Sequence, residues 1–417
     1  MKRLRNQLKA KLRPAWYRTK RVGYRLEVLG ERMRRSFPNR TAMPGDGPLD
    51  PPARAISSTR WHAAQPRERF LERVDAEETL HREPPPQTIE DELHPHFRFD
   101  LEHVVAPNVV CVLPGGRVWG DTGAIVTREN ELIDDLSIAW QTDSKSKGQH
   151  PIFANWRYRS MHLLAGTSAA LTTDGAKLYY HWLFQLLPRL DVLERGGFAL
   201  DEIDHFIVNR ALHAYERDTL ERIGVPLARI VETRNHPHIR AERLLAPSIP
   251  LHGSQFSPQL VRFVRERVGG LAPAESCQPG TRRLYLTRSG AGYRNVVNEA
   301  EVRARVEAQG FEAVALEELS FADQVQIMTE AGIVIGPHGG GMSNLVFCAP
   351  GTKVGEIFAE EYVAPWFWFL ATMTGLPYHY MIGAREPRPA LAERWDSGAS
   401  MKVDLDKLDR FLLSLTG

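Results

Sequence analysis

The glycine-rich stretch 336–341 is the part of the sequence whose composition points most directly to chemistry. It reads Gly-Pro-His-Gly-Gly-Gly and follows the apolar run 331–335. Bare backbone allows a ligand to approach closely. Residues 343–348 are expected to form a short helix, whose free N–H groups and positive dipole end favour an anion such as a diphosphate. The candidate anion-binding residues are Gly339, Gly340, Gly341, Ser343 and Asn344.

The same stretch also fits a tight connection in which glycine serves only the backbone geometry and His338 is a cap or a buried, hydrogen-bonded side chain. The next apolar run, 354–358, is typical of a strand and carries Glu356 near its C-terminal end. Open α/β sheets place ligand groups at that end of their strands. Glu356 is therefore a further candidate.

Upstream, strand and helix patterns alternate. Residues 283–287 predict a strand that ends at Arg288, and Arg294 follows in the next loop. Asn298 and Ser320 are good helix N-caps on either side of a second strand pattern. This order predicts a parallel sheet with helices on both faces. Arg288 is placed to bind a phosphate in bidentate fashion, although a surface arginine fits its position equally well.

The N-terminal half alternates in the same way and predicts a second parallel sheet. Residues 104–113 and 118–126 are expected to form a hairpin around Gly115 and Gly116. We divide the chain into a basic amphipathic arm (1–40), a Pro-rich linker (41–95), an N-terminal α/β domain (96–268), a C-terminal α/β domain (281–400) and a C-terminal helix (401–417) that is expected to fold back across the domains.

Composition fits an ordinary globular body, because 43% of the 417 residues are hydrophobic, 25% are charged and the formal net charge is +2. The three cysteines lack metal-ligand spacing and are expected to be reduced. His94 and His96, like His236 and His238, flank a turn-forming proline and have no third ligand at a recognisable spacing. No metal site is therefore predicted.

Positive charge is concentrated in the arm, which carries fourteen lysines and arginines against Glu27 and Glu31. Leu4, Leu8 and Leu12 share one helical face, which favours contact of residues 1–35 with an anionic membrane surface. A solvated tail or a nucleic-acid contact is the alternative, and we expect no nucleic acid. The sequence shows no apolar stretch of membrane-spanning length and no secretory signal, so we expect a cytoplasmic protein, peripheral on the inner face of the membrane.

Two separated motifs carry a resemblance to a known family. The first is Tyr179-Tyr180-His181-Trp182-Leu183-Phe184 with Leu187-Pro188-Arg189-Leu190. The second comprises Arg288, Arg294, Asn298-Glu299, Gly310-Phe311, Glu317, Leu319-Ser320, Gln324, Ala331, Gly336-Pro337-His338-Gly339, Asn344, Phe347, Pro350-Gly351 and Glu356-Ile357. Over about residues 150–360 the chain resembles the family 61 glycosyltransferases, which include bacterial capsular polysaccharide biosynthesis proteins.

The resemblance implies the GT-B fold, in which two Rossmann-like doubly wound domains face a cleft. It implies an inverting transfer from a nucleotide sugar, bound by the C-terminal domain, to a polysaccharide, glycolipid or glycoprotein acceptor on the N-terminal domain. Fixed positive groups can stabilise the leaving diphosphate without a metal. The nucleotide sugar is a co-substrate, and we expect no cofactor.

Within that scheme Arg288, Arg294 and the amides of 338–343 are expected to hold the diphosphate, and Glu356 the ribose hydroxyls. His181 is the predicted base, since imidazole suits proton transfer near neutral pH. His338 is the alternative, as base or as a donor to the diphosphate or sugar. The predicted acceptor-side residues are Tyr180, Trp182 and Arg189, of which both aromatic residues also fit a place in the core.

Two departures from the family pattern stand out. Gly340 replaces a common alanine, and Gln185 stands where many relatives carry an acidic residue, which leaves the identity of the base in doubt. Two other functions stay open, one because of the glycine turn before a helix and one because of Gln185. One is an NAD(P)-dependent oxidoreductase, although the glycines fail the third position of its fingerprint. The other is a non-catalytic subunit that binds or assembles glycans.

Overall fold

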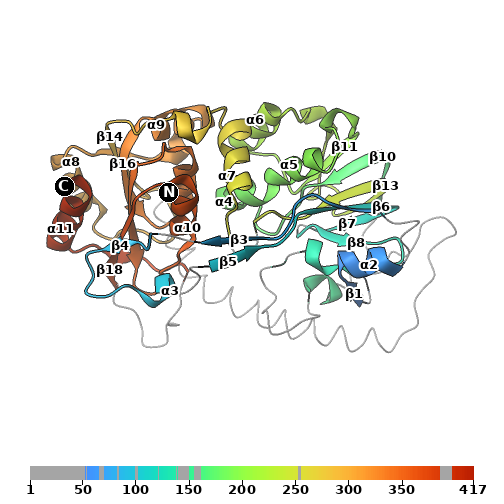
Figure 1. The fold of residues 1–417 in the computed structure, drawn as a ribbon, viewed down its shortest axis with the longest axis horizontal. Coiled ribbons are helices and arrows are strands. Elements are labelled where there is room, and N and C mark those ends of the chain that lie inside the picture. The colour runs from blue at the N-terminus through green and yellow to red at the C-terminus, as the bar shows by residue number, and fades with distance from the viewer. Residues whose placement is uncertain are drawn as a thin grey trace, which may run out of the picture.

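The computed structural model describes residues 52, 54–64, 70–81, 84–98, 102–120, 122–137, 139, 150–154, 161–251, 255–385 and 397–417. The basic arm lies outside these residues. Two large sheets with their helices stand side by side (Figure 1), so the predicted α/β class is confirmed. No helix in the described ranges is long and apolar enough to cross a membrane.

The first sheet is built on four parallel strands in the order β13-β10-β11-β12. Their bounds are His238–Pro247, His162–Ala170, His205–Val208 and Ile230–Glu232, respectively. Helices α5 (Pro188–Arg195) and α6 (Ala214–Ile223) belong to this unit. The alternation of strand and helix in the N-terminal half is thereby confirmed.

The hairpin predicted around Gly115 is wrong. Strands β6 (Val109–Pro114) and β7 (Arg117–Trp119) follow one another along β13, and both pair with it in antiparallel fashion. Gly115, at φ 64°, bends the chain between them. The hairpin forms one step later, between β7 and β8 (Ala124–Val126), and β9 (Glu131–Ile133) continues the meander.

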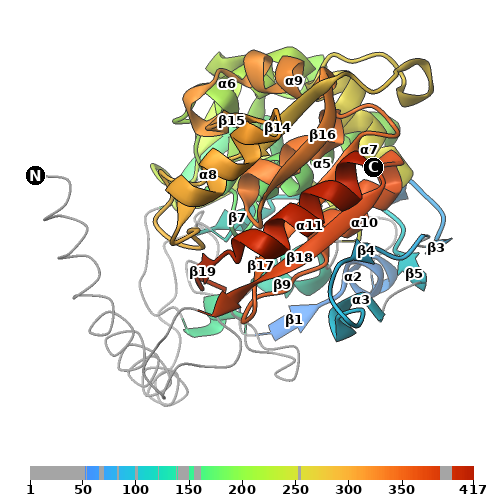
Figure 2. The same ribbon diagram turned by 90° about the vertical axis from the view of Figure 1, so that its left-hand side faces the viewer.

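The second sheet has the parallel order β15-β14-β16-β17-β18, with the short β19 (Met401–Lys402) antiparallel at the end. The parallel strands are Glu312–Val314, Arg282–Leu286, Ala331–Pro337, Lys353–Ala359 and Tyr378–Arg385. Helices α8 (Glu299–Ala308) and α11 (Leu405–Thr416) cover one face (Figure 2), and α9 (Phe321–Thr329) and α10 (Trp366–Thr374) pack on the other. The second unit is therefore doubly wound, as predicted.

The C-terminal helix does not fold back across both units. It packs on α8, β17 and β18. Arg305 on α8 pairs with Asp409, and Lys353 donates to the carbonyl of Leu415 at 2.8 Å. The apolar face of α11 therefore packs against the second sheet and its helix α8.

The range 41–95, which was predicted as a linker, contributes strands to both sheets. Strands β1 (Arg54–Ile56) and β2 (Phe70–Arg73) join the first sheet, whereas β4 (Gln87–Thr88) pairs with β18 of the second. Phe97, in the short helix α3 (Pro95–Arg98), is fully buried against Tyr380 and Trp368. Beside it, β3 (Glu78–His81) pairs with β5 (Glu102–Val105).

The two units share one hydrophobic core, which runs without a break from Trp182 and Phe206 of the first to Phe347 and Phe367 of the second. Helix α7 (Pro258–Phe263) and the π-helix after it, Val264–Val268, cross between them. Arg265 of that segment donates to the carbonyls of Val346 and Cys348 at 2.5 Å each. The junction is therefore a packed interface.

Arg189 ties together the C-terminal ends of two strands. It is fully buried and donates to the carbonyls of Thr172, after β10, and Pro247, at the end of β13. Thr172 lies beyond the end of β10, and Pro247 is the last residue of β13. Arg189 is thus part of the first unit's framework.

We predict that Arg189→Met lowers the free energy of unfolding by about 3 kcal/mol, because two buried carbonyls lose their donor. Urea unfolding followed by tryptophan fluorescence measures this difference. Arg303→Met removes an arginine from an exposed i,i+4 pair on α8 and should leave the midpoint almost unchanged. Equal midpoints for the two variants would contradict the role given to Arg189.

Candidate active site at the junction of the two units

The glycine turn after β16 brings backbone and a guanidinium into direct contact. A Cβ on Gly339 would lie 1.8 Å from Nη1 of Arg288. Only a residue without a side chain therefore fits beneath this guanidinium. Next to it, a Cβ on Gly340 would meet no atom within 4 Å, so space opens beside the turn. The predicted closeness of Arg288 and the glycines is what the structure shows.

Arg294 lies near Arg288 beside the glycine turn, and the two positive charges repel each other. Burial lowers the pKa of Arg288, and the charge of Arg294 lowers it further, while Tyr293 and Glu317 act in the opposite direction. Arg294 lies over the rings of Tyr293 and Tyr362, at 4.7 and 5.4 Å from their centroids. Such cation–π contacts offset part of the repulsion.

Both guanidinium groups keep hydrogen-bonding capacity. Their Nε atoms are buried and have no hydrogen-bond partner among the described residues, and the same holds for Oγ of the fully buried Ser343. Arg294 also has a left-handed backbone, with φ 55°, which costs a non-glycine residue about 1 kcal/mol. Unpaired donors on two adjacent cations suit a multivalent anion.

The segment after the turn is a 3₁₀ helix, η9 (Gly340–Phe347), which starts earlier than the helix predicted for 343–348. Asn344 is buried within it and is already engaged. It accepts from the hydroxyl of Tyr179 at 2.8 Å and donates to Gln324 and to the carbonyl of Gly341. Asn344 therefore joins the two units rather than presenting its amide to a ligand.

His338 and Glu356 form a buried pair on neighbouring strands. Nδ1 of His338 lies 2.5 Å from Oε1 of Glu356, and the hydroxyl of Tyr378 donates to the other carboxylate oxygen. Burial lowers the pKa of His338, Glu356 raises it, and Arg294 and Arg288 lower it again. In the neutral imidazole that this favours, Nδ1 donates to Glu356 and Nε2 carries a lone pair.

This pairing argues against the predicted contact of Glu356 with ribose. The carboxylate is fully buried and both of its oxygens are occupied. Glu356 is the middle residue of β17 (Lys353–Ala359) and not near its C-terminal end as the sequence indicated, and its side chain points to His338. Glu356 thus orients His338, and Tyr378 is a participant that sequence reasoning missed.

The opposite side of the junction carries His181 at the end of the short helix α4 (Tyr179–His181). Its Nδ1 lies 2.9 Å from Oε1 of Gln185, which also accepts from the hydroxyl of Thr173 at 3.2 Å. Burial lowers the pKa of His181 to about 4, although the hydrogen bond to Gln185 raises it. The imidazole is therefore neutral at physiological pH.

Two of the three residues predicted on the acceptor side belong to the core. Trp182 is fully buried and its indole donates to Thr219 at 3.0 Å, and Arg189 has the framework role described above. Tyr180 is half-buried. Its ring lies between Phe184 and Phe367, at 5.3 and 5.9 Å between centroids.

Aromatic contacts link the two histidines across the junction. The ring of Tyr180 lies 4.9 Å from His181 and 5.9 Å from Phe367, and the ring of Phe367 lies 5.3 Å from His338. His181, Tyr180 and His338 thus border the same junction from the two units, and their service in one site stays a prediction.

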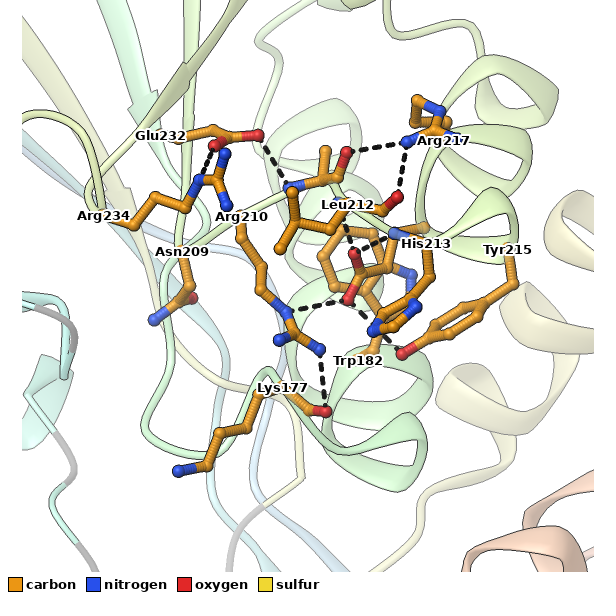
Figure 3. A network of polar contacts seen from close by, with 12 residues as sticks. Lys177, Trp182, Asn209, Arg210, Leu212, His213, Tyr215, Arg217, Glu232 and Arg234 are labelled. Carbon is orange, nitrogen blue, oxygen red and sulfur yellow. Dashed lines mark hydrogen bonds and ion pairs between the residues drawn. The ribbon is translucent and has the colours of Figure 1, made fainter. Parts of the chain in front are cut away.

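A polar network fixes the loop between β11 and α6 (Figure 3). The buried carboxylate of Glu216 accepts from the amides of Leu212 and His213 and pairs with Arg210. Arg210 also donates to the carbonyl of Lys177, in the segment that precedes His181. His213 and Glu216 form a capping box, so their spacing was the available signal, and sequence reasoning missed it.

The described residues contain no group of three or more histidine, cysteine or acidic side chains arranged to hold a metal ion. The positive groups of the site are the arginines and the backbone amides of the turn. What they can do chemically is bind and stabilise negative charge.

The region that carries this arrangement is similar to known proteins. Residues 179–355 match the family model described as Glycosyltransferase 61, so the resemblance that the sequence suggested is confirmed over this region. A beta-1,2-xylosyltransferase of Arabidopsis thaliana is 38% identical over 66 residues, which are 16% of this chain and 12% of that protein.

The mouse protein O-linked-mannose beta-1,4-N-acetylglucosaminyltransferase 2 is 29% identical over 168 residues, covering 37% of this chain and 28% of its own length. The chain thus spans well under a third of the curated relatives that it matches. The family match falls on the two motifs and on the junction between them.

The buried, neutral His181 makes stability depend on pH. Its pKa is about 4 in the folded chain against 6.5 for an ordinary histidine, so the unfolded chain binds the extra proton first as the pH falls. Between pH 7 and pH 5 this should cost about 2 kcal/mol of stability. His181→Asn should therefore lose less stability over this interval than the wild type, as measured by urea unfolding at both pH values.

His81→Asn, at an exposed position of β3, serves as the matched control and should keep the pH dependence of the wild type. An unchanged pH dependence in His181→Asn would show that the imidazole is not held neutral.

Proposed function

We propose that this protein is a glycosyltransferase that moves a sugar from a nucleotide-sugar donor to a glycan, glycolipid or glycoprotein acceptor. The match to glycosyltransferase 61 and the sugar-transfer activities in the relatives' names support this. The observation that carries the proposal is the guanidinium of Arg288 packed over Gly339 of the turn, with the charge of Arg294 acting on it. The two arginines form a fixed positive site at the C-terminal end of the second sheet.

The charge of this site suits the departure of a nucleoside diphosphate. Arg288 and Arg294 have buried Nε donors without a partner among the residues that the structure describes, and Gly339 of the turn lies beneath Arg288. An anion between the two cations would relieve their repulsion and satisfy the donors. Positive groups fixed in place stabilise a leaving group without reorganising during the reaction. We therefore propose a metal-independent transfer.

We propose a GT-B-like division of labour, in which the second unit binds the donor and the first presents the acceptor. His181 is the proposed base, because its imidazole is neutral and lies at the junction. His338 lies on the donor side with a lone pair on Nε2, which suits a contact with a sugar hydroxyl. The family implies inversion at the anomeric carbon.

The proposed cellular location of the reaction is based on the sequence alone. The arm 1–40 predicts attachment to an anionic membrane surface on the cytoplasmic side, which would suit the synthesis of a cell-envelope polysaccharide. A subunit without activity and an NAD(P)-dependent oxidoreductase remain as the alternatives to be tested.

Arg288→Ala should lower the rate of sugar transfer about 100-fold or more, because a charge-assisted contact to the leaving group is lost. A panel of UDP- and GDP-linked sugars, scored first by thermal shift and then by turnover with and without acceptor, identifies the donor. NAD is included in the panel for the oxidoreductase. Wild-type turnover in Arg288→Ala would remove this residue from the mechanism, and stabilisation by NAD alone would overturn the proposal.

Gly339→Ala provides a second test through geometry. The added methyl group would displace the guanidinium of Arg288, so we expect binding of the nucleoside diphosphate to weaken at least tenfold while the fold persists. Gly340→Ala, one residue on, meets open space and should bind like the wild type. Calorimetric titration with the nucleoside diphosphate compares the two, and equal affinities would show that the guanidinium does not bind the ligand in this position.

A further inference from the structure

The helix that carries His181 changes its winding directly after this residue. Residues Trp182–Leu186 form a π-helix, in which the amide of Leu187 donates to the carbonyl of Trp182. Pro188 begins the next helix, and because it has no N–H it cannot continue the ordinary ladder. Gln185 follows His181 by four residues, and the two side chains are in hydrogen-bond contact. Such π-turns are rare and occur frequently at functional sites.

The hydrogen bonds at Gln185 determine which ring nitrogen of His181 carries the proton. The amide oxygen of Gln185 can only accept, and the hydroxyl of Thr173 donates to it at 3.2 Å. Nδ1 of His181, at 2.9 Å from the same oxygen, must therefore donate as well. A neutral imidazole carries one proton, so Nε2 has the lone pair.

The acceptor oxygen is itself held in place. Gln185 is 6% exposed, and its partner Thr173 is clamped to Asn209 by two bonds of 3.0 Å, one in each direction between backbone and side chain. Asn209 follows β11 and begins the loop that Glu216 orders (Figure 3). The orientation of His181 is thus tied to the ends of β10 and β11.

We propose that Gln185 is the positioning residue of the transfer reaction, which fixes the proton of His181 on Nδ1 and presents Nε2 to the acceptor hydroxyl. The inference rests on the proposed function. The hydroxyl proton passes to Nε2 while its oxygen bonds to the anomeric carbon of the donor. The bond from that carbon to the phosphate oxygen breaks, and the nucleoside diphosphate leaves with the electron pair.

An amide suits this role because it cannot take up the proton. Gln185 accepts from Nδ1 both before and after Nε2 is protonated, so the imidazolium keeps its hydrogen bond throughout the step. A carboxylate at this position would favour the charged imidazole before the acceptor arrives. The residue that departs from the family pattern thus keeps the base neutral and oriented.

The test reads the tautomer of His181 directly. The full chain is labelled with ¹⁵N-histidine, and long-range ¹H–¹⁵N correlation spectra distinguish Nδ1–H from Nε2–H; the His181→Asn spectrum assigns the resonance. We expect Nδ1–H in the wild type and in Gln185→Glu, which keeps an acceptor. We expect Gln185→Leu to lose this preference, because leucine offers no acceptor.

Kinetics then connect the tautomer to the reaction. Gln185→Leu should lower kcat about 10- to 100-fold with little change in KM for the donor. Gln185→Glu should recover much of this loss only at higher pH, because its carboxylate favours the charged imidazole. Thr173→Val, which removes the other partner of the same oxygen, is the matched control and should keep the Nδ1–H signature. Thermal melting confirms that each variant is folded.

The tautomer of His181 is observed without substrate. A failure of the inference about Gln185 can therefore be told apart from a failure of the proposed function. A retained Nδ1–H signature in folded Gln185→Leu, or wild-type kcat after its loss, would overturn the inference. A normal tautomer in a wild-type protein that transfers no sugar from any tested donor would instead overturn the proposed function, and with it the role of Gln185 in transfer.

Discussion

The arrangement of the site depends on holding two positive charges close together in a partly buried corner. Repulsion between Arg288 and Arg294 is unfavourable unless something compensates it. The chain supplies the faces of Tyr293 and Tyr362, a glycine beneath the guanidinium, and a strained backbone at one of the arginines. These devices keep the cations in place, and within the described part of the chain their Nε donors have no partner. The corner is consequently organised for negative charge before any ligand arrives.

The packed junction makes this organisation useful for a reaction between two molecules. A core that continues from Trp182 to Phe347, and the bond from Tyr179 to Asn344, set the position of one unit on the other. His181 follows Tyr179 by two residues, and Asn344 lies in the helix that begins at the glycine turn. The contact between the units therefore also sets the geometry between the proposed base and the anion site. Transfer reactions gain from such fixed placement of their reacting groups.

Much of the second unit was predictable because its signals are local. The caps Asn298 and Ser320 and the alternation of apolar runs place α8 and α9 almost residue by residue. The directions of polar side chains were not predictable, since they depend on distant partners. Arg189 has a family motif around it, yet its donors serve Thr172 and Pro247 at the ends of two strands. The pairing of Glu356 with His338 also depends on a distant partner and was not predictable. The same is true of the strands that residues 41–95 add to both sheets.

The two histidines of the site differ in the groups that accept their Nδ1 protons, and this difference separates their roles. Glu356 is a carboxylate and favours a charged imidazole at His338, against burial and the two arginines. An anion between Arg288 and Arg294 would cancel much of the arginines' effect and so raise the pKa of His338. His181 is paired with the neutral amide of Gln185, and burial dominates its pKa. An incoming anion thus favours a proton on the donor-side histidine, while the acceptor-side histidine, on the other unit, stays ready to accept one. That asymmetry follows from one carboxylate and one amide. In the proposed transfer reaction it would let His338 donate to the diphosphate or the sugar and let His181 accept the proton of the acceptor hydroxyl.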